Sequence, residues 1–259
     1  LQIMHHGLNL LRNLKARAFF ALGAHEKAAA PGTYPVLVYN PHPFPVTDVF
    51  EVEFMLADQN WSKEPFVFTQ VYRGNEKLPT QCVQERSHVP IQWRKRVAFR
   101  ATLAPFSMNR FDIREELRPF PVLPQPEKEI RFENERMRLV ISKETGLIES
   151  YRVDGMEYAG QGFGTLEVFG DNEDPWGMAD NLYSSRPLGR FQLVRDPRRA
   201  AQIAACAVPE LAPVRVIEWG DVLVKVEAIM EYQGSTAIVQ YEANRFGTEV
   251  RMNIRLING

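Results

Sequence analysis

Residues 137–156, MRLVISKETGLIESYRVDGM, predict two short strands joined by a tight turn. Apolar side chains at Met137, Leu139 and Ile141 form one face of the first strand. A Thr-Gly turn follows at 145–146, and the chain returns over 147–153. An Asp-Gly pair at 154–155 is a second hairpin signal. This stretch therefore predicts an antiparallel meander.

The same chemistry extends in both directions from this meander. Towards the C-terminus, strands are predicted near 214–218, 222–232 and 236–243. A last strand has Val250, Met252, Ile254 and Leu256 on its half-buried face. Towards the N-terminus, strands are predicted at 34–40, 50–56, 66–72 and 97–103. No helical pattern interrupts them, so the fold class is mainly β, with antiparallel sandwich domains.

An amphipathic helix is predicted before the first strand, because apolar residues recur at helical spacing from Ile3 to Leu22. Four prolines in 118–126 predict an extended linker between two β regions. The expected organisation is 1–32, helix and linker; 33–116, a small sandwich; 117–126, a proline-rich linker; and 127–259, the first part of a larger sandwich. The basic run at 195–199 is interpreted as a solvated turn.

Both ends of the chain indicate a piece of a larger protein. The chain opens with Leu1 inside a helical pattern that no N-cap residue precedes. The last predicted strand continues almost to Gly259. We therefore expect further sequence on both sides.

Composition excludes several classes of partner. The formal net charge is −1, from 31 basic and 32 acidic residues, and provides no general attraction for nucleic acid or an anionic membrane. No apolar run approaches the roughly 20 residues that span a bilayer. Cys82 and Cys206 match no metal-ligand spacing and suggest no disulfide framework. We therefore expect neither a nucleic-acid nor a membrane partner. The cysteine usage fits a reducing compartment such as the cytoplasm.

The candidate binding segment is 171–180, DNEDPWGMAD, in which Asp171, Glu173, Asp174 and Asp180 surround Trp176. Carboxylates accept hydrogen bonds from vicinal hydroxyls, and an indole can cover the apolar face of a sugar. The competing interpretation is a solvated acidic loop with the tryptophan in the core. A calcium loop and a self-sufficient pair of catalytic carboxylates, about 5 Å apart in a retaining glycosidase, are further alternatives.

The histidines do not form a metal-hydrolase motif. The five histidines contain no His-x-Asp or His-Glu-x-x-His unit, and His5 and His6 would point about 100° apart on a helix. The sequence also lacks a Gly-x-Ser-x-Gly elbow and a phosphate-binding glycine loop. The residues therefore argue against an intact metal hydrolase and do not support serine-hydrolase or nucleotide chemistry.

Several segments, taken in order, resemble glycoside hydrolase family 38 α-mannosidases. Residues 36–46 (VLVYNPHPFPV) are similar to the opening strand and turn of the family's first β domain, and 99–111 (FRATLAPFSMNRF) to its closing segment. Residues 132–150 (FENERMRLVISKETGLIES) resemble the entry into its large sandwich. Residues 171–180 lie where the family has an acidic loop with a tryptophan, and 212–217 (APVRVI) resemble a later strand. The resemblance is collinear over nearly the whole chain.

This resemblance implies that catalysis belongs to another domain of the protein, and that this chain holds no catalytic residue, metal ligand or cofactor. In such enzymes an N-terminal α/β domain holds zinc and the nucleophilic Asp, and a helical bundle and β-sandwiches follow it. The chain would then be the end of the bundle, the small sandwich and the first part of a mutarotase-like large sandwich, packed on a catalytic domain that lies outside it. Ser107-Met108 and Ile257-Asn258 depart from the family pattern, which suggests a divergent bacterial subgroup.

The expected function is the accessory β region of a retaining, zinc-dependent α-mannosidase that is inactive alone. Asp171, Asp174, Trp176 and Asp180 are the expected substrate-binding residues, facing the catalytic domain and its α-mannoside. The alternative is a non-catalytic carbohydrate-binding or scaffold sandwich. A third option is another sugar hydrolase or phosphorylase with a mutarotase-like sandwich.

Overall fold

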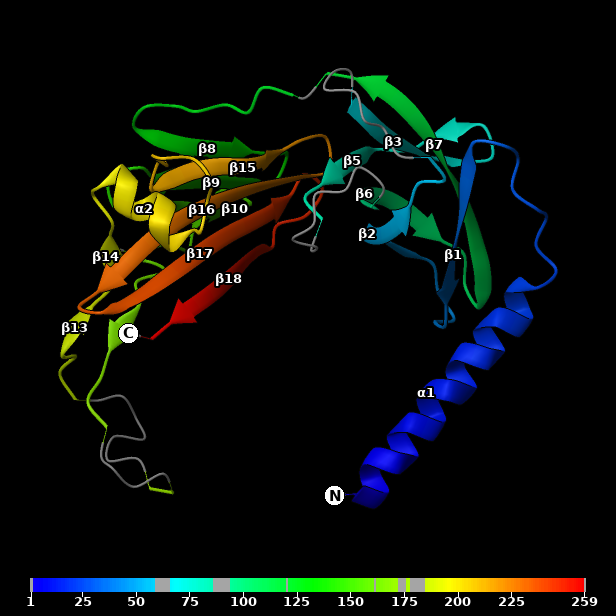
Figure 1. The fold of residues 1–259 in the computed structure, drawn as a ribbon, viewed down its shortest axis with the longest axis horizontal. Coiled ribbons are helices and arrows are strands. Elements are labelled where there is room, and N and C mark those ends of the chain that lie inside the picture. Colours follow the sequence, from blue (N-terminus) through cyan, green and yellow to red (C-terminus); the bar gives the residue numbers. More distant parts are fainter. Residues whose placement is uncertain are drawn as a thin grey trace. The chain divides into compact units, whose positions relative to one another are not determined.

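The computed structural model describes residues 2–58, 66–85, 94–119, 121–160, 162–171, 176–177 and 185–258. The chain forms two compact units, Leu1–Pro121 and Val122–Gly259, each described separately below. The mainly β, antiparallel, sandwich-like fold predicted from the sequence is confirmed (Figure 1). The division between the units lies within the proline-rich segment 117–126. In the described part of the chain, no helix has the length and apolarity to cross a bilayer.

The first unit consists of one helix and two small sheets. Its elements are α1 (Gln2–Gly23), β1 (Thr33–Asn40), β2 (Val46–Met55), β3 (Phe66–Arg73), β4 (Glu76–Lys77), β5 (Thr80–Val83), β6 (Arg94–Leu103) and β7 (Ser107–Arg118). One sheet has the order β1-β7-β3-β4 and the other β2-β6-β5, with every pairing antiparallel. The second half of β1 and the start of β7 lie opposite each other, with Asn40 paired to Ser107.

Aromatic side chains from both sheets form the core of the first unit. Phe99 of β6 and Phe111 of β7 are fully buried, with ring centroids 5.0 Å apart. Phe50 of β2 lies opposite Phe99 and adds a third ring. Burying such a side chain contributes about 1.5–3 kcal/mol. The strands predicted at 50–56 and 97–103 therefore carry side chains that hold the two sheets together.

The second unit is larger. Its elements are β8 (Glu129–Glu133), β9 (Met137–Ser142), β10 (Ile148–Val153), β11 (Met156–Glu157), β12 (Glu167–Val168), β13 (Gly189–Arg190), β14 (Gln192–Leu193), α2 (Pro197–Ile203), β15 (Val214–Trp219), β16 (Leu223–Tyr232), β17 (Ser235–Asn244) and β18 (Val250–Ile257). The predicted meander is the sheet β11-β10-β9-β8. The second sheet has the order β14-β16-β17-β18, with β15 also paired to β16, and β12 pairs with β13.

Alternating residues of these sheets form the core of the second unit. Leu139 and Ile141 of β9 pack in one cluster with Val226 of β16 and with Val239 and Tyr241 of β17. The Tyr241 hydroxyl donates a hydrogen bond of 2.9 Å to the Gly146 carbonyl, so the deepest aromatic side chain is tied to the turn between β9 and β10. Burial raises the pKa of Tyr241 to about 12.

The opposite face of the second sheet is apolar where Ile229 and Ile238 pack with α2 and polar further along the strands. Arg215 of β15 forms an ion pair with Glu227, which also accepts a hydrogen bond of 2.7 Å from Gln240. Glu242 of β17 lies between two cations, Lys225 at 2.9 Å and Arg251 at 3.0 Å. Cross-strand pairs of opposite charge stabilise a sheet modestly. Beyond the apolar cluster, this face therefore carries paired charges.

Four elements differ from the sequence predictions. The run at 195–199 is not a turn, because Asp196 caps a short helix whose first residue is Pro197. Neither β7 nor β8 was predicted as a strand, and β7 continues to Arg118, two residues into the predicted linker. The predicted half-buried face of the last strand is incomplete, because Ile254 is 47% exposed and Leu256 54% exposed.

Candidate functional site

The predicted acidic loop is only partly within the described residues. Asp171 is exposed, three residues beyond the end of β12. Trp176 is 95% exposed, so the interpretation that it packs in the core is wrong. Asp174 and Asp180 lie outside the described residues. A binding role for these four residues stays a prediction.

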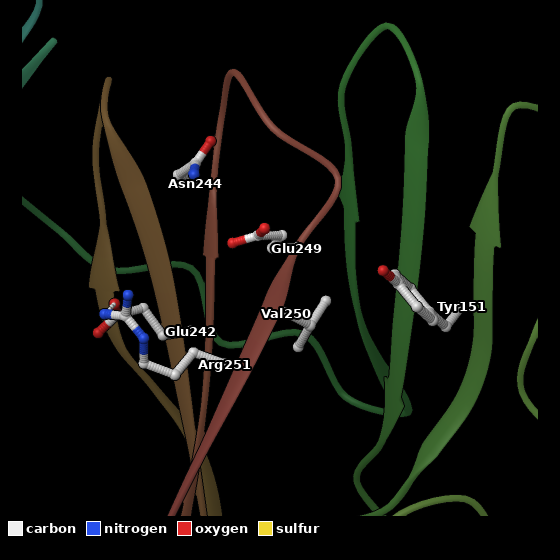
Figure 2. A pocket seen from close by; sticks show the side chains of 6 residues that line it. All are labelled: Tyr151, Glu242, Asn244, Glu249, Val250 and Arg251. Atoms are coloured by element: carbon white, nitrogen blue, oxygen red, sulfur yellow. Dashed lines mark hydrogen bonds and ion pairs between the residues drawn. The ribbon is translucent and has the colours of Figure 1, made fainter. Parts of the chain in front are cut away.

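A polar cleft lies at one end of the second unit, where β10 of one sheet approaches β17 and β18 of the other (Figure 2). Its volume is about 400 Å³. Six residues line it: Tyr151, Glu242, Asn244, Glu249, Val250 and Arg251. Five of the six come from the end of β17, the following turn and the start of β18, and Tyr151 comes from β10.

Hydrogen bonds hold the turn between β17 and β18 in place. The Asn244 side-chain oxygen accepts from the backbone N–H of Phe246 at 2.9 Å. Asn134 donates to the Gly247 carbonyl at 2.8 Å, and the Tyr151 hydroxyl donates to the Thr248 carbonyl at 2.5 Å. Side chains from β10 and from the turn between β8 and β9 therefore fix the loop that carries Glu249, although Tyr151 and Thr248 are 97 residues apart in sequence.

The electrostatics of the cleft differ from one wall to the other. Glu242 is neutralised by Lys225 and Arg251, and Figure 2 shows its carboxylate beside the Arg251 guanidinium. Glu249 is exposed, and the described residues include no cation within ion-pair distance of it. Burial, followed by the negative charge of Glu249 and by Tyr158, raises the pKa of Tyr151. The phenol therefore stays protonated and acts as a hydrogen-bond donor at neutral pH.

This arrangement is suited to binding rather than to acid–base chemistry. Carboxylate, amide and guanidinium groups can exchange hydrogen bonds with a polyhydroxylated molecule, and the Tyr151 ring offers an apolar edge. A phenol that already donates to a backbone carbonyl and has a raised pKa is a poor general base at neutral pH. Within the described ranges, no three His, Cys, Asp or Glu side chains form a group that could hold a metal ion.

Little in the amino-acid sequence indicates this cleft. Its residues are ordinary alternating positions of strands, and Glu249 and Arg251 flank Val250, one of the apolar residues expected on the half-buried face of the last strand. Their proximity to Tyr151 depends on how the two sheets meet. Chain order alone contains no signal for that contact.

Comparison with known proteins adds no assignment to this site. The chain matches none of the protein-family models against which it was compared, and a search of curated proteins found no match either. The functional interpretation therefore depends on the residues of this chain and their geometry.

Proposed function

We propose that this chain is the accessory β-sandwich region of a retaining, zinc-dependent α-mannosidase, and that it does not hydrolyse glycosides alone. The observation that supports the proposal is the order of its parts. A helix precedes a small sandwich with its own core, and a proline-rich connection leads to a second β unit with a separate core. This is the order that the resemblance to family 38 implies.

In this proposal the zinc ion and the nucleophile belong to a catalytic domain encoded before Leu1. The chain would pack against that domain in the bacterial cytoplasm. Asp171, Asp174, Trp176 and Asp180 would border the pocket for the α-mannoside. The 95% exposure of Trp176 supports such a contact role, because a large aromatic side chain on a surface loop is available to a ligand or a neighbouring domain.

Two measurements test the proposal. The gene should encode several hundred residues with a His-x-Asp unit upstream of Leu1; a gene that begins near Leu1 would contradict it. The purified chain should not hydrolyse an aryl α-mannoside when zinc is supplied. Turnover that Asp174→Asn or Asp180→Asn abolishes would show instead that the chain has its own catalytic carboxylates.

The polar cleft supports a second candidate function, non-catalytic carbohydrate binding. Glu249, Asn244 and Arg251 provide acceptors and donors beside the Tyr151 ring in a space of about 400 Å³, at the lower end of the range for small-molecule sites. In a whole mannosidase this cleft could bind a distal part of a glycan. In a stand-alone module it would be the principal site.

Nuclear magnetic resonance titration distinguishes the two candidate sites without mutation. If the cleft binds sugar, mannose or a mannobiose should shift the backbone amide signals of residues 151, 244 and 249–251. If the acidic loop binds sugar, the shifts should instead lie within 171–180. An absence of shifts in both regions up to about 50 mM sugar, well above millimolar affinity, would reject carbohydrate binding by the isolated chain.

A further inference from the structure

We propose that Asp154-Gly155 is a modification site of this chain, at which the aspartate isomerises to isoaspartate through a succinimide, and that Arg136 restrains this reaction in the folded protein. All three residues lie in the turns of the meander in the second unit. The inference does not rest on the proposed function, because it uses only these turns and the chemistry of their side chains.

The first observation is the place of the dipeptide in the hairpin. It is the only Asp-Gly pair in the sequence, and it forms the two-residue loop between Val153 of β10 and Met156 of β11. Both loop residues are exposed. A Cβ atom added to Gly155 would meet no atom within 4 Å. The peptide nitrogen between the two residues is therefore accessible, and no side chain of its own residue shields it.

The second observation concerns the Gly155 N–H, which is the attacking group of the reaction. The strand pairing on either side of the loop joins Val153 to Met156 and leaves the loop residues out. Within the described ranges, the Gly155 N–H donates no hydrogen bond. The attacking group is free, so the Asp154 carboxyl determines whether the reaction proceeds.

The third observation is that Arg136, in the turn between β8 and β9, holds this carboxyl. The Arg136 Nε donates to Asp154 Oδ1 at 2.9 Å, and Nη2 donates to Oδ2 at 2.6 Å. The Asp154 backbone N–H donates in turn to the Arg136 carbonyl at 2.8 Å. Both carboxyl oxygens are thus engaged, in the bidentate geometry that arginine forms with carboxylates.

The reaction requires the carboxyl in its neutral form. The Gly155 nitrogen forms a bond to the Asp154 Cγ, and one carboxyl oxygen leaves as water with the proton of the acid and the hydrogen of the amide. Water then opens the succinimide ring. Cleavage at the backbone carbonyl gives isoaspartate, and cleavage at the side-chain carbonyl restores aspartate. Neither step needs an oxidant or a cofactor.

Arg136 opposes ring closure in two ways. Its hydrogen bonds and its positive charge lower the pKa of Asp154, so less of the carboxyl is neutral at a given pH. Among the charged groups of the described elements, Arg136 alone shifts this pKa. In addition, the carboxyl must leave the guanidinium before it can react with the Gly155 nitrogen. Removal of Arg136 should therefore accelerate isomerisation.

The first experiment uses the purified full chain without mutation. The chain is incubated for several weeks at mildly acidic pH, and fragmentation by electron transfer in a mass spectrometer distinguishes isoaspartate from aspartate in the digested peptides. Residue 154 should accumulate isoaspartate faster than any other aspartate. The folded chain should react more slowly than the same chain unfolded in guanidinium chloride, where Arg136 no longer holds the carboxyl. No isoaspartate at 154, or an equal rate in both states, would overturn the proposal.

Substitutions then test the role of Arg136. Arg136→Ala should raise the rate about three- to fivefold, as expected when an exposed ion pair is lost. Arg136→Lys keeps the charge without the bidentate contact, so its rate should lie between those of the wild type and the alanine variant. Gly155→Ala should slow the reaction, because a Cβ hinders attack by the nitrogen. Arg131→Ala is the matched control: it removes another exposed ion pair, with Glu129, from the same sheet and should leave the rate unchanged.

Hydrogen exchange with mass spectrometry checks that β9 and β10 stay protected in each variant. If Arg136→Ala keeps this protection and isomerises at the wild-type rate, Arg136 is no restraint and the proposal fails. Equal acceleration by Arg131→Ala would also overturn it, because a general loosening of the sheet would then be responsible. If Arg136→Ala loses protection, Arg136→Lys decides: a rate above that of the wild type supports the restraint, and a wild-type rate rejects it.

Discussion

Gly146 lies in the turn between β9 and β10 at a point where the turn enters the core of the second unit. Its φ is +72°, in the left-handed region, and a Cβ atom there would lie 3.0 Å from the Ala228 Cβ and 3.0 Å from a Leu193 methyl carbon. The Met230 methyl carbon would be 3.3 Å away. Gly146→Ala therefore combines backbone strain with overpacking.

The two effects can be given magnitudes. A left-handed conformation costs a residue with a Cβ roughly 1–2 kcal/mol. Adding a methyl group to a packed core costs about 1–3 kcal/mol, because neighbours must leave their preferred rotamers. Ala228 is fully buried and has no flexible side chain that could move away. Together these effects should lower the free energy of unfolding by roughly 2–5 kcal/mol.

Gly155 provides a matched control. It also has a positive φ, +84°, in the next turn of the meander, but no atom would lie within 4 Å of its added Cβ. Gly155→Ala should therefore cost only the backbone part, about 1–2 kcal/mol. Urea unfolding followed by far-UV circular dichroism measures both variants, and hydrogen exchange with mass spectrometry shows whether the loss of protection is confined to the second unit.

The difference between the two variants tests the reasoning. If Gly146→Ala and Gly155→Ala lower stability equally, the core around the first turn is loose enough to accept a methyl group, and the packing argument is wrong. If Gly146→Ala is neutral, the left-handed conformation is also wrong.

Three other substitutions have defined outcomes. Tyr241→Phe leaves the Gly146 carbonyl without its donor and should cost about 1–3 kcal/mol at neutral pH. Burial raises the pKa of Tyr241 from 10.0 to about 12, so the unfolded chain loses this proton at a lower pH than the folded chain. The free energy of unfolding should therefore fall by about 3 kcal/mol as the pH rises from 10 to 12. Unfolding of the Phe variant, measured over the same pH range, should lack this fall. Asp196→Ala removes the acceptor for the Arg198 N–H at 2.9 Å and should cost about 1 kcal/mol in urea unfolding, whereas Asp196→Asn should retain most of it. Asn40→Ala removes the side-chain donor to the Phe44 and Ala104 carbonyls and should lower the free energy of unfolding of the first unit by about 2–3 kcal/mol. Hydrogen exchange should show reduced protection in the first unit and unchanged protection in the second.

The regular β elements could be predicted because their signals are local. Alternation over 137–141, the Thr-Gly turn and the Asp-Gly turn correspond to β9, β10 and β11 in the structure. The strands predicted near 214–218, 222–232 and 236–243 agree with β15, β16 and β17 within one or two residues. A period of two and a turn residue with positive φ are properties of a few neighbouring residues, so they are visible in one sequence.

The sequence prediction missed helix α2 because the charged residues at 195–199 were given more weight than the capping residue that precedes the helix. The charges in the run at 195–199 suggested a solvated turn, but Asp196 and Pro197 together form a cap and first-turn pair typical of a helix start. Ala200 and Ile203 are buried against Val194 and Ile229. The helix is stabilised by this packing as well as by its cap, and only the cap could have been recognised beforehand.

In the candidate sites, too, residue types could be read from the sequence, whereas their positions depend on tertiary structure. The acidic loop was predicted from residue types, and the structure adds that Trp176 is exposed and not part of the core. The polar cleft was missed, because Tyr151 reaches Thr248 from another sheet.

The sequence by itself determined the strands, their turns and the mainly β class, because these follow from backbone preferences and from alternation between neighbours. Tertiary structure alone decided which strands share a sheet, which face of β18 stays half exposed and which side chains from β10 and β18 form a cleft. Those features depend on contacts between residues far apart in the chain, such as Tyr241 with Gly146. Pairing over such separations is selected by the total burial of both sheets and not by any local pattern.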